Sequence, residues 1–156
     1  MKRSTRPANS NPRRTGALEE AVFLDLLRTT DLLSRRLVPV LKESAVSPAQ
    51  YNVLRILRGA PEGLTCGEIA GRLITRDPDI TRLLDRMEKR GLITRERQKD
   101  DRRVVKARIT PHGLALLKPL DQPMRDLHKR QFRRIAATHL KTLYDLLEEI
   151  RCNQQE

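Results

Sequence analysis

One stretch of the chain carries hydrogen-bond donors in an arrangement suited to recognition rather than to catalysis. Between 77 and 90, apolar residues recur every three or four positions, which predicts an amphipathic helix. Its start and its polar face carry the donors Arg76, Thr81, Arg82 and Arg86. Such side chains bind base edges or phosphates, with guanine the expected partner of a bidentate arginine. Asp79 either accepts from a cytosine amino group or is a first-turn acid that faces water. Asp85 and Glu88 are expected to pair with neighbouring basic side chains.

The sequence offers little that would support an enzyme. It has no Gly-rich phosphate loop, nucleophile elbow or Cys-x-x-Cys pair. His128, His139 and Glu148 could meet in a metal site, but their spacing matches no known ligand pattern, and surface or interface histidines are the alternative. We therefore expect no catalytic residue, no metal and no cofactor. Cys66 and Cys152 are isolated thiols, consistent with a reducing cytosol. Cys66 is interpreted as a small buried residue, with redox sensing as the alternative.

Two short helices must position the donors. The first is marked by a capping box, in which Thr65 is followed by Glu68, and Gly71 within it would allow close helix approach. Its buried residues should be Ile69, Ala70, Leu73 and Ile74. The second helix should begin at Asp77-Pro78, because Asp caps free amides and Pro loses no hydrogen bond at the first helical position. It should end at Gly91, which tolerates a left-handed backbone. Its apolar face is Ile80, Leu83, Leu84 and Met87.

A basic β-hairpin should follow these helices. The extended runs 92–97 and 104–109 are rich in β-branched and basic residues, and residues 98–103 between them are too polar to be buried. Two packed helices and a basic hairpin form a winged helix-turn-helix. In that fold the second helix reads a DNA major groove, and the hairpin tip reaches an adjacent minor groove. The predicted fold class is mainly α, with a small β-hairpin wing and a helical dimerisation region.

These residues resemble the signature of the MarR (multiple antibiotic resistance regulator) family. The resemblance spans roughly residues 18–150 and rests on Ser47–Leu54, Thr81–Glu88, Gly91–Ile93, Asp101–Arg103 and Ile109–Thr110 with Gly113. It implies a homodimeric, ligand-responsive transcription regulator that acts as a repressor. It also implies that Arg103 enters the minor groove, that Asp101 steadies its guanidinium, and that Arg102 lies beside them. The alternative is an exposed ion pair without a role in binding.

The flanking segments are interpreted as a tail and as dimerisation helices. Residues 1–16 hold five Lys or Arg and no acid, which predicts a disordered basic tail, either an arm on phosphates or a solvated leader. Residues 17–46 should form a dimerisation helix that Pro39 kinks or ends near Arg36. Residues 47–110 form the DNA-binding region and 111–156 the C-terminal dimerisation helices. The apolar positions expected at the dimer interface are Leu18, Val22, Leu140, Leu143, Leu147 and Ile150.

Three helices are predicted around the DNA-reading segment. One should have Ser47 as its N-cap and stop at Gly59. A long helix should open at Thr110-Pro111 and bend or break near Pro119 and Pro123. The last should run from about 136 to 151. By the resemblance, a small phenolic or apolar-anionic effector would bind between the dimerisation helices and the reading region. The residues proposed for that pocket are Phe23, Leu27 and Tyr51, with a well-filled core as the alternative.

The charge balance points to a polyanionic partner. The 156 residues carry a formal charge of +12, although residues 62–110, with 13 basic and 9 acidic residues, carry only +4. A membrane surface is the competing partner, but no long, aromatic-bearing basic amphipathic helix, transmembrane stretch or secretory signal supports it. Aromatic residues are 3% of the chain, which favours a helical bundle over a β-sandwich. We expect a cytoplasmic protein that binds double-stranded DNA, with a sequence-tolerant nucleoid protein as the alternative to an operator-specific regulator.

Overall fold

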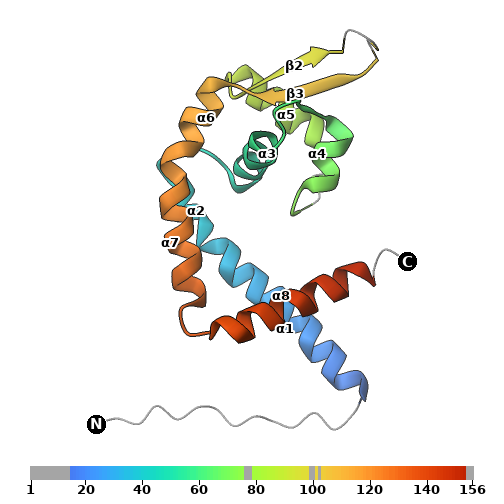
Figure 1. Cartoon of the computed structure of the whole chain (residues 1–156), viewed down its shortest axis with the longest axis vertical. Helices are drawn as coiled ribbons and strands as arrows, with labels where there is room; N and C mark the ends of the chain where they lie inside the picture. Colours follow the sequence, from blue (N-terminus) through green and yellow to red (C-terminus); the bar gives the residue numbers. More distant parts are fainter. Residues whose placement is uncertain (1–14, 76–78, 99–100, 102, 154–156) are drawn as a thin grey trace. The chain divides into compact units, whose positions relative to one another are not determined.

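The computed structural model describes residues 15–75, 79–98, 101 and 103–153 (Figure 1). The chain divides after Arg35 into two units. The second unit is helical with one small antiparallel sheet, so the predicted fold class is confirmed. The predicted tail, residues 1–16, falls outside the described residues except for its last two positions. Those two begin the first helix, α1 (Thr15–Arg35), two residues before the expected start.

Helix α1 presents a broad apolar stripe to its surroundings. Five exposed side chains of this stripe are Leu18, Val22, Phe23, Leu27 and Leu32. The polar side of the helix carries two exposed ion pairs, one between Arg28 and Asp25 and one between Arg35 and Asp31. The helix ends at Arg35, as the downstream Pro39 predicts, and α2 (Leu37–Lys42) follows after the single residue Arg36. Among the described residues, no helix combines the length and apolar character that a membrane span requires.

Local capping explains where the next helices start. In α3 (Pro48–Arg58) the Ser47 side chain accepts from the Gln50 amide while the Gln50 side chain accepts from the Ser47 amide, and Gly59 ends the helix. The predicted capping box of Thr65 and Glu68 likewise opens α4 (Cys66–Arg72). Both starts are confirmed. Between them lies β1 (Leu64–Thr65), which is too short to have been predicted from sequence.

The reading helix and the hairpin follow. Helix α5 (Ile80–Lys89) leads through Gly91, whose φ is +67°, into β2 (Ile93–Arg97), and β3 (Val105–Ile109) returns. The sheet order is β1-β3-β2, with Arg95 opposite Ala107 and Leu64 also opposite Ala107 on the other side of β3. α5 packs against β2, while α3 and α4 pack against β3 (Figure 1). The sheet therefore connects the hairpin to helices α3, α4 and α5.

Three further helices complete the second unit. Thr110 caps α6 (Pro111–Leu117), a 3-10 turn at Lys118–Leu120 contains Pro119, and α7 (Asp121–Phe132) continues from it. The predicted break near Pro119 is confirmed, whereas Pro123 is accommodated in the first turn of α7, where its missing N–H costs no helical bond. The last helix, α8 (Ala137–Cys152), contains no buried residue. The two oxygens of the Asp121 carboxylate lie 2.9 and 3.0 Å from Nη1 of Arg58, which ties α7 to α3.

One core runs through the second unit from α2 to α7. Six of its fully buried side chains, drawn from five helices, are Leu41, Leu54, Leu57, Ile69, Met87 and Leu117. Of the residues expected to be buried in α4, Ile69 is fully buried, and Ala70 and Leu73 are half-buried. Ile74 is 82% exposed, which contradicts the prediction. The physical reason is that α4 ends at Arg72 and Leu73 is extended, so Ile74 leaves the helical periodicity.

Close backbone approach occurs at glycines other than the expected one. A Cβ at Gly71 would meet nothing within 4 Å, so the predicted close approach there is wrong. A Cβ at Gly113 would lie 2.4 Å from the Leu92 carbonyl oxygen, and one at Gly63, whose φ is +75°, would lie 2.8 Å from the Ala107 carbonyl oxygen. These two glycines let α6 and the turn before β1 sit against the hairpin.

Candidate nucleic-acid interface

Helix α5 has the amphipathic character that the sequence predicts. Leu83, Leu84 and Met87 are buried and Ile80 is packed against the core. Thr81, Arg82 and Arg86 are exposed on the polar side. The core residues fix the helix by burial, so the exposed donors are held on a rigid support rather than on a loop. Arg76, expected at the helix start, lies outside the described residues.

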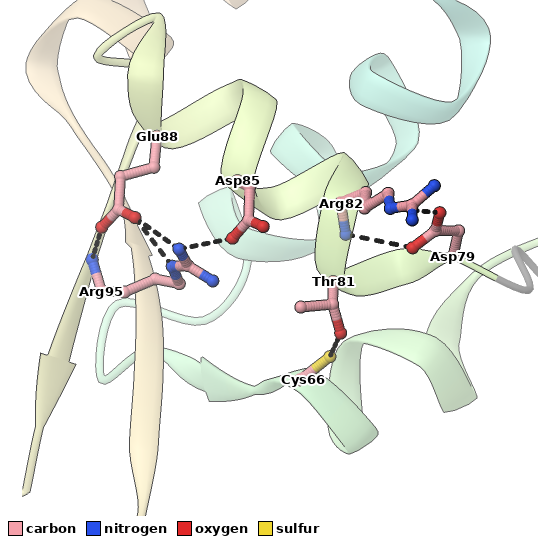
Figure 2. A network of polar contacts seen from close by, with 7 residues as sticks. All are labelled: Cys66, Asp79, Thr81, Arg82, Asp85, Glu88 and Arg95. Atoms are coloured by element: carbon pink, nitrogen blue, oxygen red, sulfur yellow. Dashed lines mark hydrogen bonds and ion pairs between the residues drawn. The ribbon is translucent and has the colours of Figure 1, made fainter.

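The start of α5 corrects the prediction for Asp79. This residue has φ −123° and ψ 44°, and its carboxylate accepts from the Arg82 amide at 3.4 Å. It is therefore the N-cap of a helix that begins at Ile80, rather than a first-turn acid behind an Asp77 cap. The same carboxylate lies 3.2 Å from Nε of Arg82, on an exposed surface (Figure 2). Asp79 thus supports the helix and holds the Arg82 side chain near the helix N-terminus.

Thr81 also faces a side chain of the preceding helix. Its hydroxyl lies 4.0 Å from Sγ of Cys66, the first residue of α4 (Figure 2). Cys66 is only half-buried and Cys152 is exposed, so the expectation of a small buried residue at 66 holds in part. This contact is one of the places where the two helices of the reading motif meet.

The two acids on α5 have a common partner that was not singled out from the sequence. Nη2 of Arg95, on β2, lies 2.6 Å from Asp85 Oδ1 and 2.6 Å from Glu88 Oε2 (Figure 2). Glu88 also accepts from Nε of Arg95 at 2.9 Å and from the Arg95 backbone N–H at 3.1 Å. The hydrogen bonds that Arg95 donates to Glu88 raise the pKa of the Arg95 guanidinium above its ordinary value. The expectation that Asp85 and Glu88 pair with basic side chains is confirmed.

The other end of α5 is held by a second arginine, which is the C-cap residue of the helix. Arg90 donates from Nη1 to the Ala45 carbonyl at 3.0 Å and to the Gln50 side chain at 3.1 Å. Ala45 has φ +48°, which is a left-handed backbone at a non-glycine residue. Gln50 is a buried polar residue and also serves the α3 capping box. The Arg90 guanidinium is therefore already bonded within the protein. A count of basic residues thus overstates how many positive side chains are available to bind DNA.

The wing tip brings Asp101 and Arg103 together, but through different atoms from those expected. The Asp101 carboxylate accepts from the backbone N–H of Arg103 at 2.9 Å, and the Asp101 carbonyl accepts from the Val104 N–H at 3.0 Å. Within the described residues, no contact joins the carboxylate to the Arg103 guanidinium, so that expectation is corrected. The geometry is a turn in which an Asp side chain caps the chain two residues on. Both side chains are exposed, and Arg102 lies outside the described residues.

The remaining candidate sites are distributed over both units. Phe23 and Leu27 are exposed on α1, in the first unit. Tyr51 belongs to the core of the second, where burial raises the pKa of its phenol and the Arg55 guanidinium lies 5.8 Å from its ring centre. Within the described part of the chain, His128, His139 and Glu148 do not come together as metal ligands. His128 lies 3.2 Å from Gln131, and Glu148 accepts from the Tyr144 hydroxyl.

Proteins of known structure and function resemble this chain in sequence and fold. The MarR family model matches residues 46–105, which contain the reading helix and most of the wing. The chain is 40% identical to a MarR transcription factor of known structure from Planctomyces limnophilus, with 86% of this chain and 98% of that one covered and a TM-score of 0.64. It is 26% identical to Sco3205 from Streptomyces coelicolor, a MarR family transcriptional regulator solved in complex with DNA, over 95% and 94% of the chains with a TM-score of 0.80.

A curated relative extends the comparison to a protein of named function. The chain is 24% identical over 132 residues to the homoprotocatechuate degradative operon repressor of Escherichia coli, which covers 85% of this chain and 88% of the relative. Together with the 40% identity to a MarR factor over nearly its whole length, the matched fold and sequence establish the relationship. The chain belongs to the MarR family of winged helix-turn-helix transcriptional regulators.

Proposed function

We propose that this protein is a homodimeric, sequence-specific DNA-binding regulator that represses transcription. The observation that carries the proposal is the exposed donor face of α5, with Thr81, Arg82 and Arg86, on a helix whose opposite face is buried. A similar regulator from S. coelicolor was solved in complex with DNA, and the E. coli relative is named as a repressor. Both facts support a DNA partner for this face.

The two reading elements have different roles in the proposal. Arg82 and Arg86 enter a major groove, where a bidentate arginine selects guanine, and Arg76 and Asp79 flank them at the helix start. The tip residues Asp101, Arg102 and Arg103 reach the adjacent minor groove, whose negative potential is strongest where the groove is narrow. Arg82 must leave Asp79 to reach a base. That exposed pair is worth about 0–1 kcal/mol, whereas a base contact contributes roughly 1–3 kcal/mol, so the exchange is favourable.

Dimerisation rests on the apolar surfaces that a single chain leaves exposed. Leu18 and Val22 of α1 and Leu140, Leu143 and Ile150 of α8 are large apolar side chains in contact with water, and Leu147 on the same α8 stripe is half-buried. Burying such stripes between two chains is the ordinary way to remove them from solvent. A twofold dimer then places its two reading helices about 34–36 Å apart, one turn of duplex or a multiple of it.

The response to a ligand is also part of the proposal. The E. coli relative is named for a homoprotocatechuate degradative operon, and homoprotocatechuate is a phenolic acid. A phenolic or other apolar-anionic effector at Phe23, Leu27 and Tyr51 would weaken the binding of DNA. Heating the protein with a panel of aromatic acids tests this, because a ligand of the folded state raises Tm with concentration. Because the proposed partner is chromosomal DNA, we also propose that the protein is located in the cytoplasm.

The decisive experiment is selection of duplexes from a randomised library at physiological salt. The proposal expects an enriched inverted repeat, bound by a dimer at least ~1000-fold more tightly than random duplex. A nucleoid protein would enrich no motif and would bind all duplexes alike, with affinity set by salt. Failure to bind any duplex would overturn the proposal as a whole.

A further inference from the structure

Arg95 belongs to the wing but turns its guanidinium back to the reading helix. Its Nε and Nη2 atoms face the carboxylates of Asp85 and Glu88 at 2.6–2.9 Å, and its side chain is only 28% exposed (Figure 2). Arg103 of the same hairpin, in contrast, is exposed. Two of the three guanidinium nitrogens of Arg95 are thus held by protein. A phosphate contact by this residue is therefore restricted to Nη1 as long as these bonds hold.

Glu88 ties the main chain of the wing as well as its side chain. The sheet order is β1-β3-β2, so β2 has a strand neighbour on one side only. On its open side the backbone N–H of Arg95 donates to Glu88 Oε1, and Nε and Nη2 of the same residue donate to Glu88 Oε2. A carboxylate of α5 therefore occupies the place that another strand would take. The reading helix and the wing are joined through both backbone and side chain.

The charges at this contact favour a positioning role. Asp85 and Glu88 are two negative charges on a helix proposed to enter a groove lined by phosphates, and simple electrostatics predicts that they oppose binding. Arg95 balances only one of them. Acids at these positions are understandable if they hold the wing at a fixed angle to the helix. A wing that is already held does not have to be ordered when DNA binds, so less entropy is lost.

We infer that Arg95 is a positioning residue for DNA binding, which clamps the wing to the reading helix so that both reach their grooves together. The inference rests on the proposed function. It assigns Asp85 and Glu88 to the same clamp, with no contact of their own to DNA. It also distinguishes Arg95, which sets the geometry of the wing, from the exposed Arg103, which is proposed to face DNA.

The first test compares two arginines of the hairpin. The probe is the duplex that the wild-type protein selects from a randomised library. Arg95→Met should weaken its binding roughly tenfold, the size of one lost groove contact. Arg95→Lys should recover only part of the loss, because the charge returns without the planar fork. Arg108→Met is the matched control. Arg108 lies on β3, and its side chain contacts the Pro61 carbonyl and Glu62. The Arg108→Met substitution therefore removes the same charge but leaves the contacts of Arg95 with Asp85 and Glu88 intact.

The second test is the sign of the effect at the acids. Glu88→Gln and Asp85→Asn each remove a negative charge, so electrostatics alone predicts tighter binding to every duplex. The clamp predicts weaker binding to the selected duplex instead. Glu88→Gln also carries the test if Arg95→Met fails to fold, because its amide oxygen can still accept from the Arg95 backbone N–H. Tighter binding by both acid variants would overturn the inference.

The third test separates positioning from general destabilisation. In an Arg103→Ala background the wing contact is already lost, so Arg95→Met should cost little more, whereas Arg108→Met should cost the same in both backgrounds. An additive loss for Arg95→Met, or unchanged binding by that variant, overturns the inference while the proposed function stands. A wild-type protein that selects no duplex overturns the proposed function itself.

Discussion

The Asp101 carboxylate lies two residues before Arg103, and a hydrogen bond joins it to the main chain of that residue. The bond to the Arg103 N–H measures 2.9 Å. It stabilises the turn from which the exposed Arg103 side chain projects. If Arg103 binds DNA as proposed, Asp101 assists it through the main chain, so the acceptor oxygen of Asp101 is needed and its negative charge is not.

This distinction can be tested with two substitutions at one residue. Asp101→Asn keeps an acceptor oxygen and removes the charge, so it should bind the selected duplex as tightly as wild type or more tightly. Asp101→Ala removes the acceptor and should bind it more weakly, although it removes the same charge. Fluorescence anisotropy at fixed salt measures both. If the Asn variant were as weak as the Ala variant, the charge would matter and the turn would not explain the effect.

Arg82 and Arg86 allow a second prediction for single residues. Each to Ala should cost roughly 1–3 kcal/mol on the selected duplex if it reads a base, because no other donor replaces the bidentate contact. Thermal unfolding should stay near wild type, since both side chains are exposed opposite the buried face. Titration against random duplex is the control. An equal loss on random duplex would identify a phosphate contact, and a lower Tm would mean that the face has been misassigned.

At the scale of elements, hydrophobic periodicity and capping residues predicted most of the second unit. The reason is local: Ser47 and Thr65 satisfy helix amides within three residues, which sequence spacing reveals directly. The start of α5 was misplaced because Asp77 and Asp79 are both able to cap. Spacing alone does not choose between two aspartates that lie two residues apart, whereas the backbone shows Asp79 at the N-cap.

The candidate site is predictable from the sequence to a similar extent, and the part that is missed is missed for a similar reason. The polar face of α5 follows from periodicity alone, so Thr81, Arg82 and Arg86 were found. Arg95, in contrast, is not distinguished by the sequence from the other basic residues of the hairpin. Its partners lie seven and ten residues earlier and face it only because the chain reverses at Gly91, where φ is +67°. A possible signal was the presence of two acids on an otherwise basic reading helix.

Two glycines provide a matched test of how the elements pack. Gly113→Ala places a Cβ 2.4 Å from the Leu92 carbonyl oxygen, and because that atom is backbone, relief requires movement of α6 or the hairpin. We expect a loss of about 1–3 kcal/mol in the free energy of unfolding. Gly71→Ala, in α4, meets open space and should stabilise by about 0.5–1 kcal/mol. Urea unfolding measures both, and equal effects would contradict the packing described for α6.

At the scale of the whole molecule, charge is distributed unevenly. Of the formal +12, residues 1–16 contribute +5 and residues 62–110 contribute +4. Several arginines of the second unit are neutralised internally: Arg58 by Asp121, Arg95 by two acids and Arg108 by Glu62. Net charge thus describes long-range attraction to a polyanion. In the proposed function, selection of a sequence comes from the exposed donors on α5 and at the wing tip.

The proposed twofold operator depends on the proposed dimer, and α8 offers a test of that dimer. Leu143 lies on the exposed apolar stripe, so Leu143→Glu should dissociate the dimer, because a charge would be buried against apolar partners. Thr142→Glu adds the same charge on the polar side of α8 and should leave the dimer intact. Sedimentation velocity gives the mass. Leu143→Glu should keep its helical circular dichroism, since the side chain is already exposed in one chain, and should lose affinity for the inverted repeat far more than for a half-site. A wild-type protein that sediments as a monomer, or a Leu143→Glu variant that remains dimeric, would mean that this stripe is not the interface.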